Sequence, residues 1–190
     1  RNNVDGTRTV AQCAERHGTR RFVLISTDKA VNPVSVMGKS KREAEKALMA
    51  LNAAKSGTSF CAVRFGNVFG SSGSVVPLFR EQIAAGGPVT VTDPAMKRYF
   101  MTVQEAVSLV LQAASRTERA IYTLEMGEPV AILKLAEGLI RRAGYRPYKD
   151  IPIVFTGIRP GEKLFEELDV SEKSAFRTDM AKIYITKMEE

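Results

Sequence analysis

Short apolar runs alternate with longer segments of helical periodicity along this chain of 190 residues. Runs of this length are typical of buried strands, whereas the longer segments repeat apolar residues with the period of a helix. We predict strands at residues 21–26, 59–65, 89–92, 120–125 and 151–155. We predict helices at 3–17, 35–54, 76–85, 103–115 and 131–143, with another helix that begins near residue 163. Strands that alternate with helices in this way predict an α/β fold with a doubly wound parallel sheet.

The composition indicates a globular, water-soluble chain. Hydrophobic residues make up 44% of it, which is enough for one packed domain with a small lobe attached. No apolar run approaches the roughly 18 residues that span a bilayer, and the N-terminus lacks the apolar region of a signal peptide. Cys13 and Cys61 are isolated and there is one histidine, so we expect reduced thiols, no disulfide and no metal site. Free thiols favour a cytoplasmic location.

The charge balance narrows the class of partner. The chain carries 28 Lys and Arg residues against 21 Asp and Glu residues, a formal net charge of +7. Such an excess suits a nucleic acid, an anionic membrane surface or a phosphorylated small ligand. The positive residues are scattered, with no run of five and no interleaved aromatic residues, so we expect no nucleic-acid binding. An anionic substrate fits this pattern better.

The first residues predict a chain that begins inside a larger α/β domain. Arg1–Val4 lead directly into a helical pattern with no strand before it. No G-x-G-x-x-G motif follows a strand, and Gly66 and Gly70 have the wrong spacing for one. We therefore expect the half that would hold the ADP part of a dinucleotide to lie outside this sequence, and this piece alone to be inactive.

Polar, reactive residues follow the first predicted strand. Thr27, Asp28 and Lys29 supply a hydroxyl, a carboxyl and an amine at consecutive positions, and the next helix carries Met37 and Lys41 four residues apart on one face. Ligands of open α/β sheets bind just beyond the carboxyl ends of the strands, so this segment is a candidate active site. The structural alternative is that Asp28 caps a turn and Lys29 is solvated.

Four motifs, in order along the chain, resemble one known family. They are Ser26-Thr27-Asp28-Lys29-Ala30-Val31-Asn32-Pro33, Met37-Gly38-x-x-Lys41, Val63-Arg64-Phe65-Gly66-Asn67-Val68-x-Gly70-Ser71-x-Gly73-Ser74-Val75-x-Pro77 and Arg159-Pro160-Gly161-Glu162-Lys163-Leu164-x-Glu166-Glu167-Leu168. Nearly end to end, the chain resembles the polysaccharide-biosynthesis branch of the extended short-chain dehydrogenases/reductases, the nucleotide-sugar 4,6-dehydratases. Met37 stands where many relatives carry the tyrosine of Tyr-x-x-x-Lys, although the large membrane-tethered members also carry methionine. A thioether cannot transfer a proton, so proton transfer falls to neighbouring residues.

The resemblance implies a UDP-N-acetylglucosamine 4,6-dehydratase that uses tightly held NAD rather than NADP. By matching positions, Asp28 would protonate the leaving C6 hydroxyl and Lys29 would remove the C5 proton. Lys41 would bind the nicotinamide ribose, and Thr27 would lie near the C4 oxygen. The base at C4 stays open between Thr27, Asp28 acting through a water, and Lys41, and we assign Met37 a packing or gating role.

The resemblance also implies the residues that contact the ligands. Cofactor contacts are expected at Ser26, Thr27, Lys41, Phe65, Gly66 and Asn67. Substrate contacts are expected at Asn67, Val76, Pro77, Thr90, Val91, Arg98, Arg159 and Glu162. Backbone N–H groups near Gly73 to Val76 would face the diphosphate, the alternative being a plain β-α turn. Arg98 and Arg159 would bind phosphate oxygens, with surface ion pairs as the alternative.

The expected architecture is a Rossmann-like doubly wound parallel sheet, incomplete because its N-terminal half is absent, with a small α/β substrate-binding lobe. Residues 1–73 would form the C-terminal half of the NAD-binding domain, and 74–190 mostly the nucleotide-sugar lobe, with 100–125 returning to the sheet. Two other functions stay open, a nucleotide-sugar 4-epimerase of the same superfamily and a non-catalytic nucleotide-sugar-binding fragment. Relatives also imply a homo-oligomer. Membrane contact, at the cytoplasmic face of the inner membrane, would come only through segments not present here.

Overall fold

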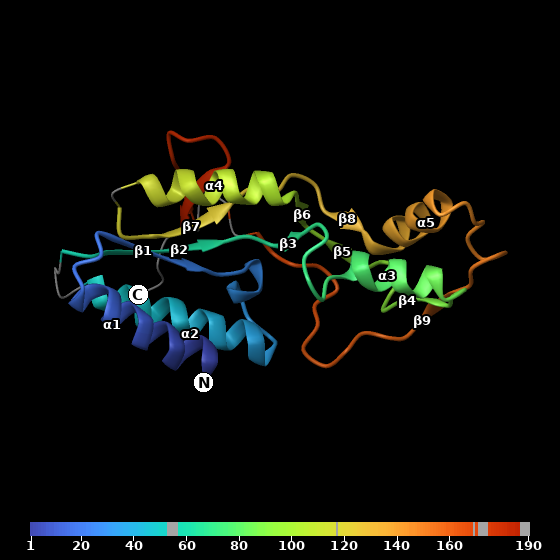
Figure 1. Cartoon of the computed structure of the whole chain (residues 1–190), viewed down its shortest axis with the longest axis horizontal. Coiled ribbons are helices and arrows are strands. Elements are labelled where there is room, and N and C mark those ends of the chain that lie inside the picture. Colours follow the sequence, from blue (N-terminus) through green and yellow to red (C-terminus); the bar gives the residue numbers. More distant parts are fainter. Residues whose placement is uncertain (53–56, 117, 169, 171–174, 187–190) are drawn as a thin grey trace. The chain divides into compact units, whose positions relative to one another are not determined.

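The computed structural model describes residues 1–52, 57–116, 118–168, 170 and 175–186 (Figure 1). The chain divides into two compact units, each built from separate segments. Unit 1 comprises Arg1–Phe65, Gln104–Glu125 and Glu167–Glu190, and unit 2 comprises Gly66–Val103 and Met126–Glu166.

Unit 1 contains a five-stranded sheet with the order β1-β2-β7-β11-β10. Its parallel part consists of β1 (Arg21–Ile25), β2 (Ser59–Arg64) and β7 (Ile121–Leu124). The antiparallel part consists of β11 (Ile183–Thr186), which pairs with β7, and β10 (Ala175–Arg177), which pairs with β11. The parallel sheet predicted from the alternating pattern is therefore confirmed, and two antiparallel strands that were not predicted extend it. The two added strands are only three and four residues long, which is shorter than the runs from which the other strands of this sheet were predicted.

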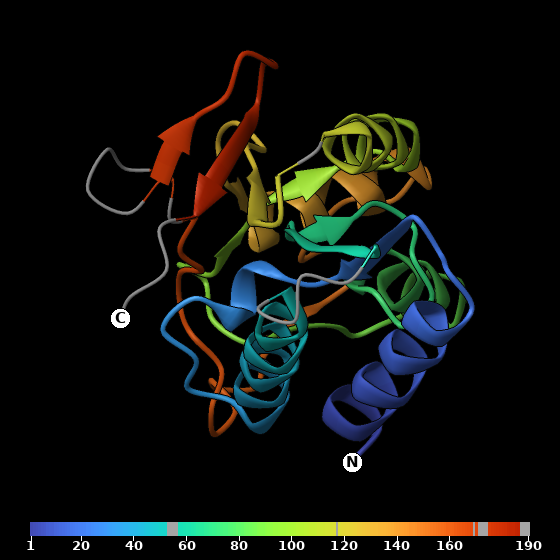
Figure 2. The same ribbon diagram turned by 90° about the vertical axis from the view of Figure 1, so that its left-hand side faces the viewer.

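Helices cover both faces of this sheet, as Figure 1 and Figure 2 show. On one face lie α1 (Thr7–Arg16), preceded by a π-helical turn at Asn2–Gly6, and α2 (Val36–Leu51), and on the other face lies α4 (Val103–Ser115). The core between the first two helices and the sheet is formed by Ala11, Leu24, Ala44, Leu48, Phe60, Ala62 and Ile121. The predicted end of the long helix, at residues 53 and 54, lies outside the described residues.

Unit 2 is built from two helices and three pairs of short strands. The helices are α3 (Val75–Ala84) and α5 (Ile132–Arg142). The strand pairs are β3 (Asn67–Val68) with β6 (Phe100–Met101), β4 (Val89–Val91) with β9 (Ile153–Phe155), and β5 (Lys97–Arg98) with β8 (Val130–Ala131). Its core gathers buried aliphatic and aromatic side chains from both helices and from β4, among them Phe79, Ile83, Val89, Ile132 and Ile140.

One expectation is corrected in the C-terminal third. No helix begins near residue 163, because the carbonyl oxygens of Lys163 and Leu164 accept hydrogen bonds from Arg98 and are not used by a helix. Along the chain, unit 1 first gives way to unit 2 at Phe65/Gly66, and residues from Glu167 onward belong to unit 1, whose sheet includes β10 and β11. The functional roles of the two units stay predictions.

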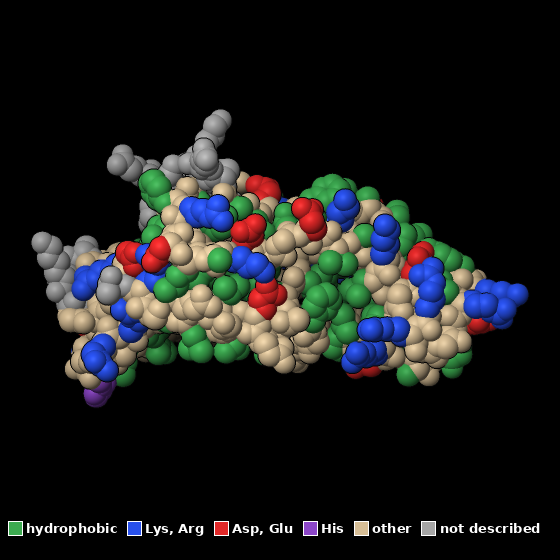
Figure 3. Space-filling view, turned by 90° about the horizontal axis from the view of Figure 1, so that it is seen from above, with side chains coloured by type: hydrophobic (Ala, Val, Ile, Leu, Met, Phe, Trp, Pro, Cys, Tyr) green, Lys and Arg blue, Asp and Glu red, His purple; other side chains and the backbone are tan. Residues whose placement is uncertain are grey.

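The distribution of charged side chains and the character of the helices are the features that bear on binding of nucleic acid, membrane or metal. On the face seen in Figure 3, Lys and Arg side chains are interspersed with Asp and Glu side chains and form no single continuous stripe. Within the described ranges, no helix has both the length and the apolar character needed to cross a membrane. Nor do the described residues hold a cluster of three or more His, Cys, Asp or Glu side chains that could bind a metal ion.

Candidate functional site

The chain turns sharply where β1 ends in unit 1. Asp28–Ala30 form a single 3₁₀ turn, and Thr27 caps it by accepting a hydrogen bond from the backbone N–H of Lys29 at 3.3 Å. The backbone N–H of Asp28 donates to the carbonyl oxygen of Phe65 at 3.0 Å, which ties this turn to the end of β2. The predicted acid and base thus lie at the carboxyl edge of two parallel strands, where ligands of such sheets bind.

The Asp28 carboxylate is buried, with only 1% of the residue exposed. Its Oδ1 accepts hydrogen bonds from the Thr27 hydroxyl at 2.9 Å and from the Lys29 ammonium at 3.0 Å. Its Oδ2 has no hydrogen-bond partner among the described residues. Burying a carboxylate oxygen without a partner is unfavourable, and such atoms in native structures call for an explanation such as a ligand or a catalytic role. Asp28 is therefore both a turn residue and a carboxyl group with one oxygen left for another group.

Lys41 reaches the same strand exit from α2. Its Nζ donates to the carbonyl oxygen of Ile25 at 3.0 Å. Gly38 lets the helix approach this closely, because a Cβ built there would lie only 2.2 Å from the Lys29 carbonyl oxygen. Met37, on the preceding turn, is 44% exposed. The structure thus brings Lys41 to the end of β1, one helical turn from the Met37 thioether.

A buried charge network directly behind this exit was missed by sequence reasoning. Glu45 on α2 is 1% exposed, and its carboxylate accepts hydrogen bonds from the Ser26 hydroxyl at 2.5 Å and from Arg64 at 2.6 and 2.8 Å. The Ser26 hydroxyl, expected to face the cofactor, donates to Glu45 instead. The available signals were the Lys41-x-x-x-Glu45 spacing, which places both residues on one helix face, and an arginine that ends an otherwise apolar strand.

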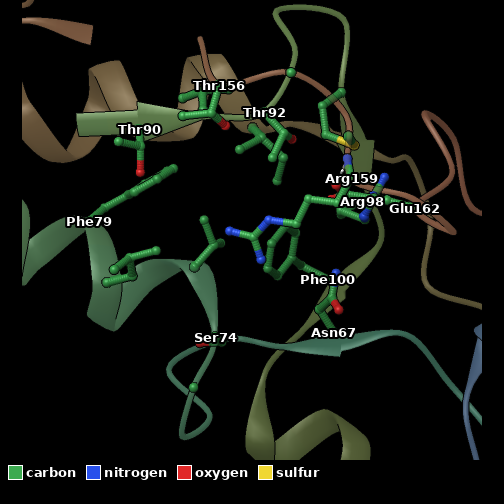
Figure 4. A pocket seen from close by; sticks show the side chains of 17 residues that line it. Asn67, Ser74, Phe79, Thr90, Thr92, Arg98, Phe100, Thr156, Arg159 and Glu162 are labelled. Atoms are coloured by element: carbon green, nitrogen blue, oxygen red, sulfur yellow. Dashed lines mark hydrogen bonds and ion pairs between the residues drawn. The ribbon is translucent and has the colours of Figure 1, made fainter. Parts of the chain in front are cut away.

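Unit 2 contains a pocket of about 470 Å³, shown in Figure 4. It is lined by Asn67, Gly73, Ser74, Val75, Leu78, Phe79, Thr90, Val91, Thr92, Met96, Arg98, Phe100, Ile132, Thr156, Gly157, Arg159 and Glu162. Most of the expected substrate residues are in this set, but Val76 and Pro77 are not, and Val76 is buried within α3. A concave pocket that combines apolar walls with several convergent polar groups is a candidate small-ligand site.

Arg98 lines the pocket, but its guanidinium already makes its hydrogen bonds and ion pairs with other groups of the protein. The residue is 8% exposed, and its guanidinium makes ion pairs with Glu162 at 3.3 Å and with Glu166 at 3.8 Å. It also donates to backbone carbonyl oxygens of Lys97, Lys163 and Leu164. Arg98 therefore holds the segment that carries Glu162, and its expected contact with phosphate stays a prediction.

Arg159 is the cation that remains available. It lies in the loop after β9, and among the described residues its guanidinium has no hydrogen bond or ion pair, while its backbone N–H donates to Glu162. Ser74 precedes α3, and its buried hydroxyl also has no partner among those residues. Arg98, Arg159 and Glu162 lie at one end of the pocket in Figure 4, and Thr90 and Phe79 lie at the other. An arginine and a helix N-terminus that open on one pocket favour an anionic ligand.

Comparisons with known proteins show which family the chain belongs to. Residues 1–188 match the family described as polysaccharide biosynthesis protein. The chain is 58% identical over 169 residues to the probable polysaccharide biosynthesis protein EpsC of Bacillus subtilis, covering 88% of this chain and 28% of that protein. It is 37% identical to UDP-glucose 4-epimerase of Rickettsia canadensis over 98% of this chain and 54% of that enzyme. The chain therefore spans between about a quarter and a half of these relatives.

Solved structures show the same fold. Pen from Bacillus thuringiensis superposes with a TM-score of 0.87 at 33% identity, covering 97% of this chain and 58% of that one. The dTDP-glucose 4,6-dehydratase DesIV from Streptomyces venezuelae, solved with NAD and TYD bound, has a TM-score of 0.77 at 24% identity, over 88% of this chain and 56% of that one. These matches confirm the predicted incomplete Rossmann-like fold. The chain belongs to the polysaccharide biosynthesis protein family, and it has the fold of the C-terminal portion of an extended short-chain dehydrogenase/reductase of the nucleotide-sugar dehydratase and epimerase group.

Proposed function

We propose that the protein containing this chain dehydrates UDP-N-acetylglucosamine to a 4-keto-6-deoxy sugar for polysaccharide biosynthesis, with NAD as cofactor. The observation that carries this proposal is the buried Asp28–Lys29 pair at the end of β1, with Met37 on the adjacent helix in place of a phenol. Oxidation and reduction at C4 alone need one group that transfers a proton. Elimination of water needs an acid and a base together, and this site supplies both.

The pair can reach the required protonation states by one short transfer. A proton that moves across the 3.0 Å contact from Lys29 to Asp28 leaves a neutral amine beside a carboxylic acid. With a ketone at C4, the C5 proton becomes acidic and Lys29 removes it, while Asp28 donates its proton to the C6 hydroxyl, which leaves as water. Over the whole reaction C4 is oxidised, C6 is reduced and one water is lost, so no external oxidant is consumed.

Lys41 is the residue that fits a nicotinamide cofactor best. Its ammonium lies at the strand exit and donates one N–H to the Ile25 carbonyl oxygen. The other N–H groups of the ammonium can then donate to ribose hydroxyls. NAD, when bound, would supply the hydride acceptor for C4 and the hydride donor for C6. Ser26 and Gly66 fit less well as donors, because the Ser26 hydroxyl is bonded to Glu45 and the Gly66 N–H to the Met126 sulfur.

The pocket of unit 2 suits the UDP part of the substrate. Arg159, Ser74 and the N-terminus of α3 would bind the diphosphate, because each offers N–H or O–H donors without protein partners among the described residues. The apolar walls formed by Phe79 and Phe100 would pack against the nucleoside. Asn67, Thr90, Val91 and Glu162 remain candidate contacts in the same pocket.

A 4-epimerase is the second candidate, and the 37% identity to UDP-glucose 4-epimerase of Rickettsia canadensis favours it. The two reactions differ at C6, because an epimerase product keeps its C6 oxygen and a dehydratase product does not. The adjacent acid and base at Asp28 and Lys29 favour the dehydratase.

The test is mass-spectrometric analysis of the product that the full-length protein forms from UDP-N-acetylglucosamine. We expect a product lighter by one water, and we expect Lys29→Ala to lower turnover by roughly 10²- to 10⁴-fold, the usual contribution of an acid–base group. Lys46→Ala, an exposed lysine on α2, is the matched control and should keep full turnover. Binding of UDP without any turnover would instead identify a nucleotide-sugar-binding protein, and full activity of Lys29→Ala would remove the proposed base.

A further inference from the structure

Two side-chain contacts join the end of β1 to α2 within unit 1. The Ser26 hydroxyl donates to the Glu45 Oε1 at 2.5 Å, and the Lys41 Nζ donates to the carbonyl oxygen of Ile25 at 3.0 Å. Lys41 and Glu45 are four residues apart, so they lie on one face of the helix. Two consecutive residues at the strand exit are therefore tied to two consecutive turns of α2.

The two contacts differ in burial and in the groups that they use. The Lys41 contact is exposed, and the same ammonium is the proposed partner of the nicotinamide ribose. The Ser26 contact is shielded from water, because Ser26 is 5% exposed and Glu45 is 1% exposed. Arg64 on β2 neutralises Glu45 through hydrogen bonds at 2.6 and 2.8 Å. A buried hydrogen bond to a paired carboxylate is stronger than an exposed one, and ligand binding need not break it.

Ser26 lies two residues before the proposed acid. The backbone N–H of Asp28 donates to the carbonyl oxygen of Phe65 at 3.0 Å, which holds the turn on the end of β2. Among the described residues, the hydrogen bonds to the Asp28 carboxylate come only from its neighbours Thr27 and Lys29. These two bonds move with the turn, so they do not fix it on α2. The Ser26 side chain does contact α2, directly before the turn begins.

We propose that Ser26 is a positioning residue, whose hydrogen bond to Glu45 fixes the turn with Asp28 and Lys29 relative to α2. A carboxylate only accepts hydrogen bonds, so the Ser26 hydroxyl proton is committed to Glu45 and is not available to a cofactor. Without this bond the turn can shift, and a displacement of about 1 Å at reacting groups can lower turnover about 10²-fold. The inference rests on the proposed function for the roles of Asp28 and Lys29, but it concerns how these residues are held in place.

Kinetics and amide hydrogen exchange of the full-length protein with Ser26→Ala test the proposal. We expect kcat with UDP-N-acetylglucosamine to fall by about tenfold to 100-fold, while KM and the affinity for NAD stay unchanged. Exchange of the peptide that contains the Asp28 and Val31 N–H groups should become about tenfold faster, the effect of losing one hydrogen bond to a charged group. Ser26→Thr keeps the hydroxyl and should restore both kcat and slow exchange. Ser115→Ala, which removes an exposed hydroxyl that donates within α4, is the matched control and should behave as the wild type.

Several outcomes would overturn the proposal. They are an unchanged kcat in Ser26→Ala, an exchange rate of the turn equal to that of the wild type, and a loss of NAD affinity with normal exchange, which would make Ser26 a cofactor contact. Should Ser26→Ala fail to fold, Ser26→Cys, whose thiol is a weaker donor, takes its place with the same expectations. Exchange is measured without substrate. A looser turn in a protein that forms no 4-keto-6-deoxy product would therefore contradict the proposed reaction and leave the role of Ser26 intact.

Discussion

The strand exit of unit 1 and the pocket of unit 2 use their charged side chains differently. At the strand exit, Asp28 is bonded to Lys29, and Glu45 directly behind it is bonded to Arg64. In the pocket, Arg98 is fully occupied, but Arg159 has no hydrogen bond or ion pair among the described residues. The charged side chains at the strand exit are thus held by partners within the protein. The pocket of unit 2, in contrast, contains an arginine whose hydrogen-bond donors can bind a ligand.

The largest expected effect concerns the acid of unit 1. Asp28→Asn preserves the shape of the side chain and the contact with Thr27 but removes the transferable proton, so we expect turnover of UDP-N-acetylglucosamine to fall by roughly 10²- to 10⁴-fold with little change in UDP affinity. Steady-state kinetics and UDP titration measure the two effects. Asp5→Asn, an exposed aspartate before α1, serves as the control. A variant that keeps its turnover would show that Asp28 only caps the turn.

The second effect concerns the stability of the network behind the strand exit. Glu45→Leu leaves the buried Arg64 without its partner, and we expect a loss of about 3–5 kcal/mol in the free energy of unfolding. The double variant Glu45→Leu with Arg64→Leu removes both charges and should recover much of that loss. Urea unfolding of the three proteins gives the values. If Glu45→Leu alone were as stable as the double variant, leaving Arg64 without its partner would have no cost in the free energy of unfolding.

Substitution of the two arginines of the pocket should have different effects: one on the stability of the protein and the other on its affinity for UDP. Arg98→Gln removes the donors that hold the segment around Glu162, so we expect a loss of about 1.5–3 kcal/mol in stability. Arg159→Gln should leave the melting temperature unchanged and weaken UDP binding by about tenfold. Thermal melts and UDP titration of both variants measure this. If the Arg98→Gln and Arg159→Gln variants had the same melting temperature and the same affinity for UDP, the two arginines would not differ in role.

The smallest effect is a pH dependence within unit 1. Burial raises the pKa of the Cys61 thiol on β2 from 9.0 to about 11. Because the folded state holds this proton more tightly than the unfolded state, the stabilisation is complete below pH 9 and is lost as the pH rises toward 11. The stability difference between the wild type and Cys61→Ala should therefore shrink over that interval. Cys13→Ala, at an exposed thiol, should show no such change.

The sequence predicts the parts of this structure that depend on neighbouring residues. The strand that leads to Asp28 is visible as a short apolar run, and the acid and base are consecutive, so no knowledge of the fold is needed to pair them. The Glu45–Arg64 pair is different, because its partners are 19 residues apart and meet only when α2 packs on β2. Likewise, β10 pairs with β11 although its Phe176 is 59% exposed and gives no alternating pattern.

The error near residue 163 has the same origin. A helix was predicted to begin near residue 163, but a distant side chain, Arg98, donates to the carbonyl oxygens of Lys163 and Leu164. In the same way, the sequence alone does not distinguish the roles of Arg98 and Arg159. The structure shows that Arg98 is paired with acidic side chains, whereas the Arg159 guanidinium has no partner among the described residues. Long-range polar contacts of this kind override local propensity and leave little trace in a single sequence.

The central claim is that the Asp28–Lys29 pair performs an elimination. The most direct test is to run the reaction of the full-length protein with UDP-N-acetylglucosamine in D₂O and to examine the product by NMR and mass spectrometry. We expect a product that has lost the C6 oxygen and carries deuterium at C5, because a base removes that proton and solvent replaces it. A product that keeps the C6 oxygen and its original hydrogen at C5 would show that Asp28 and Lys29 perform no elimination.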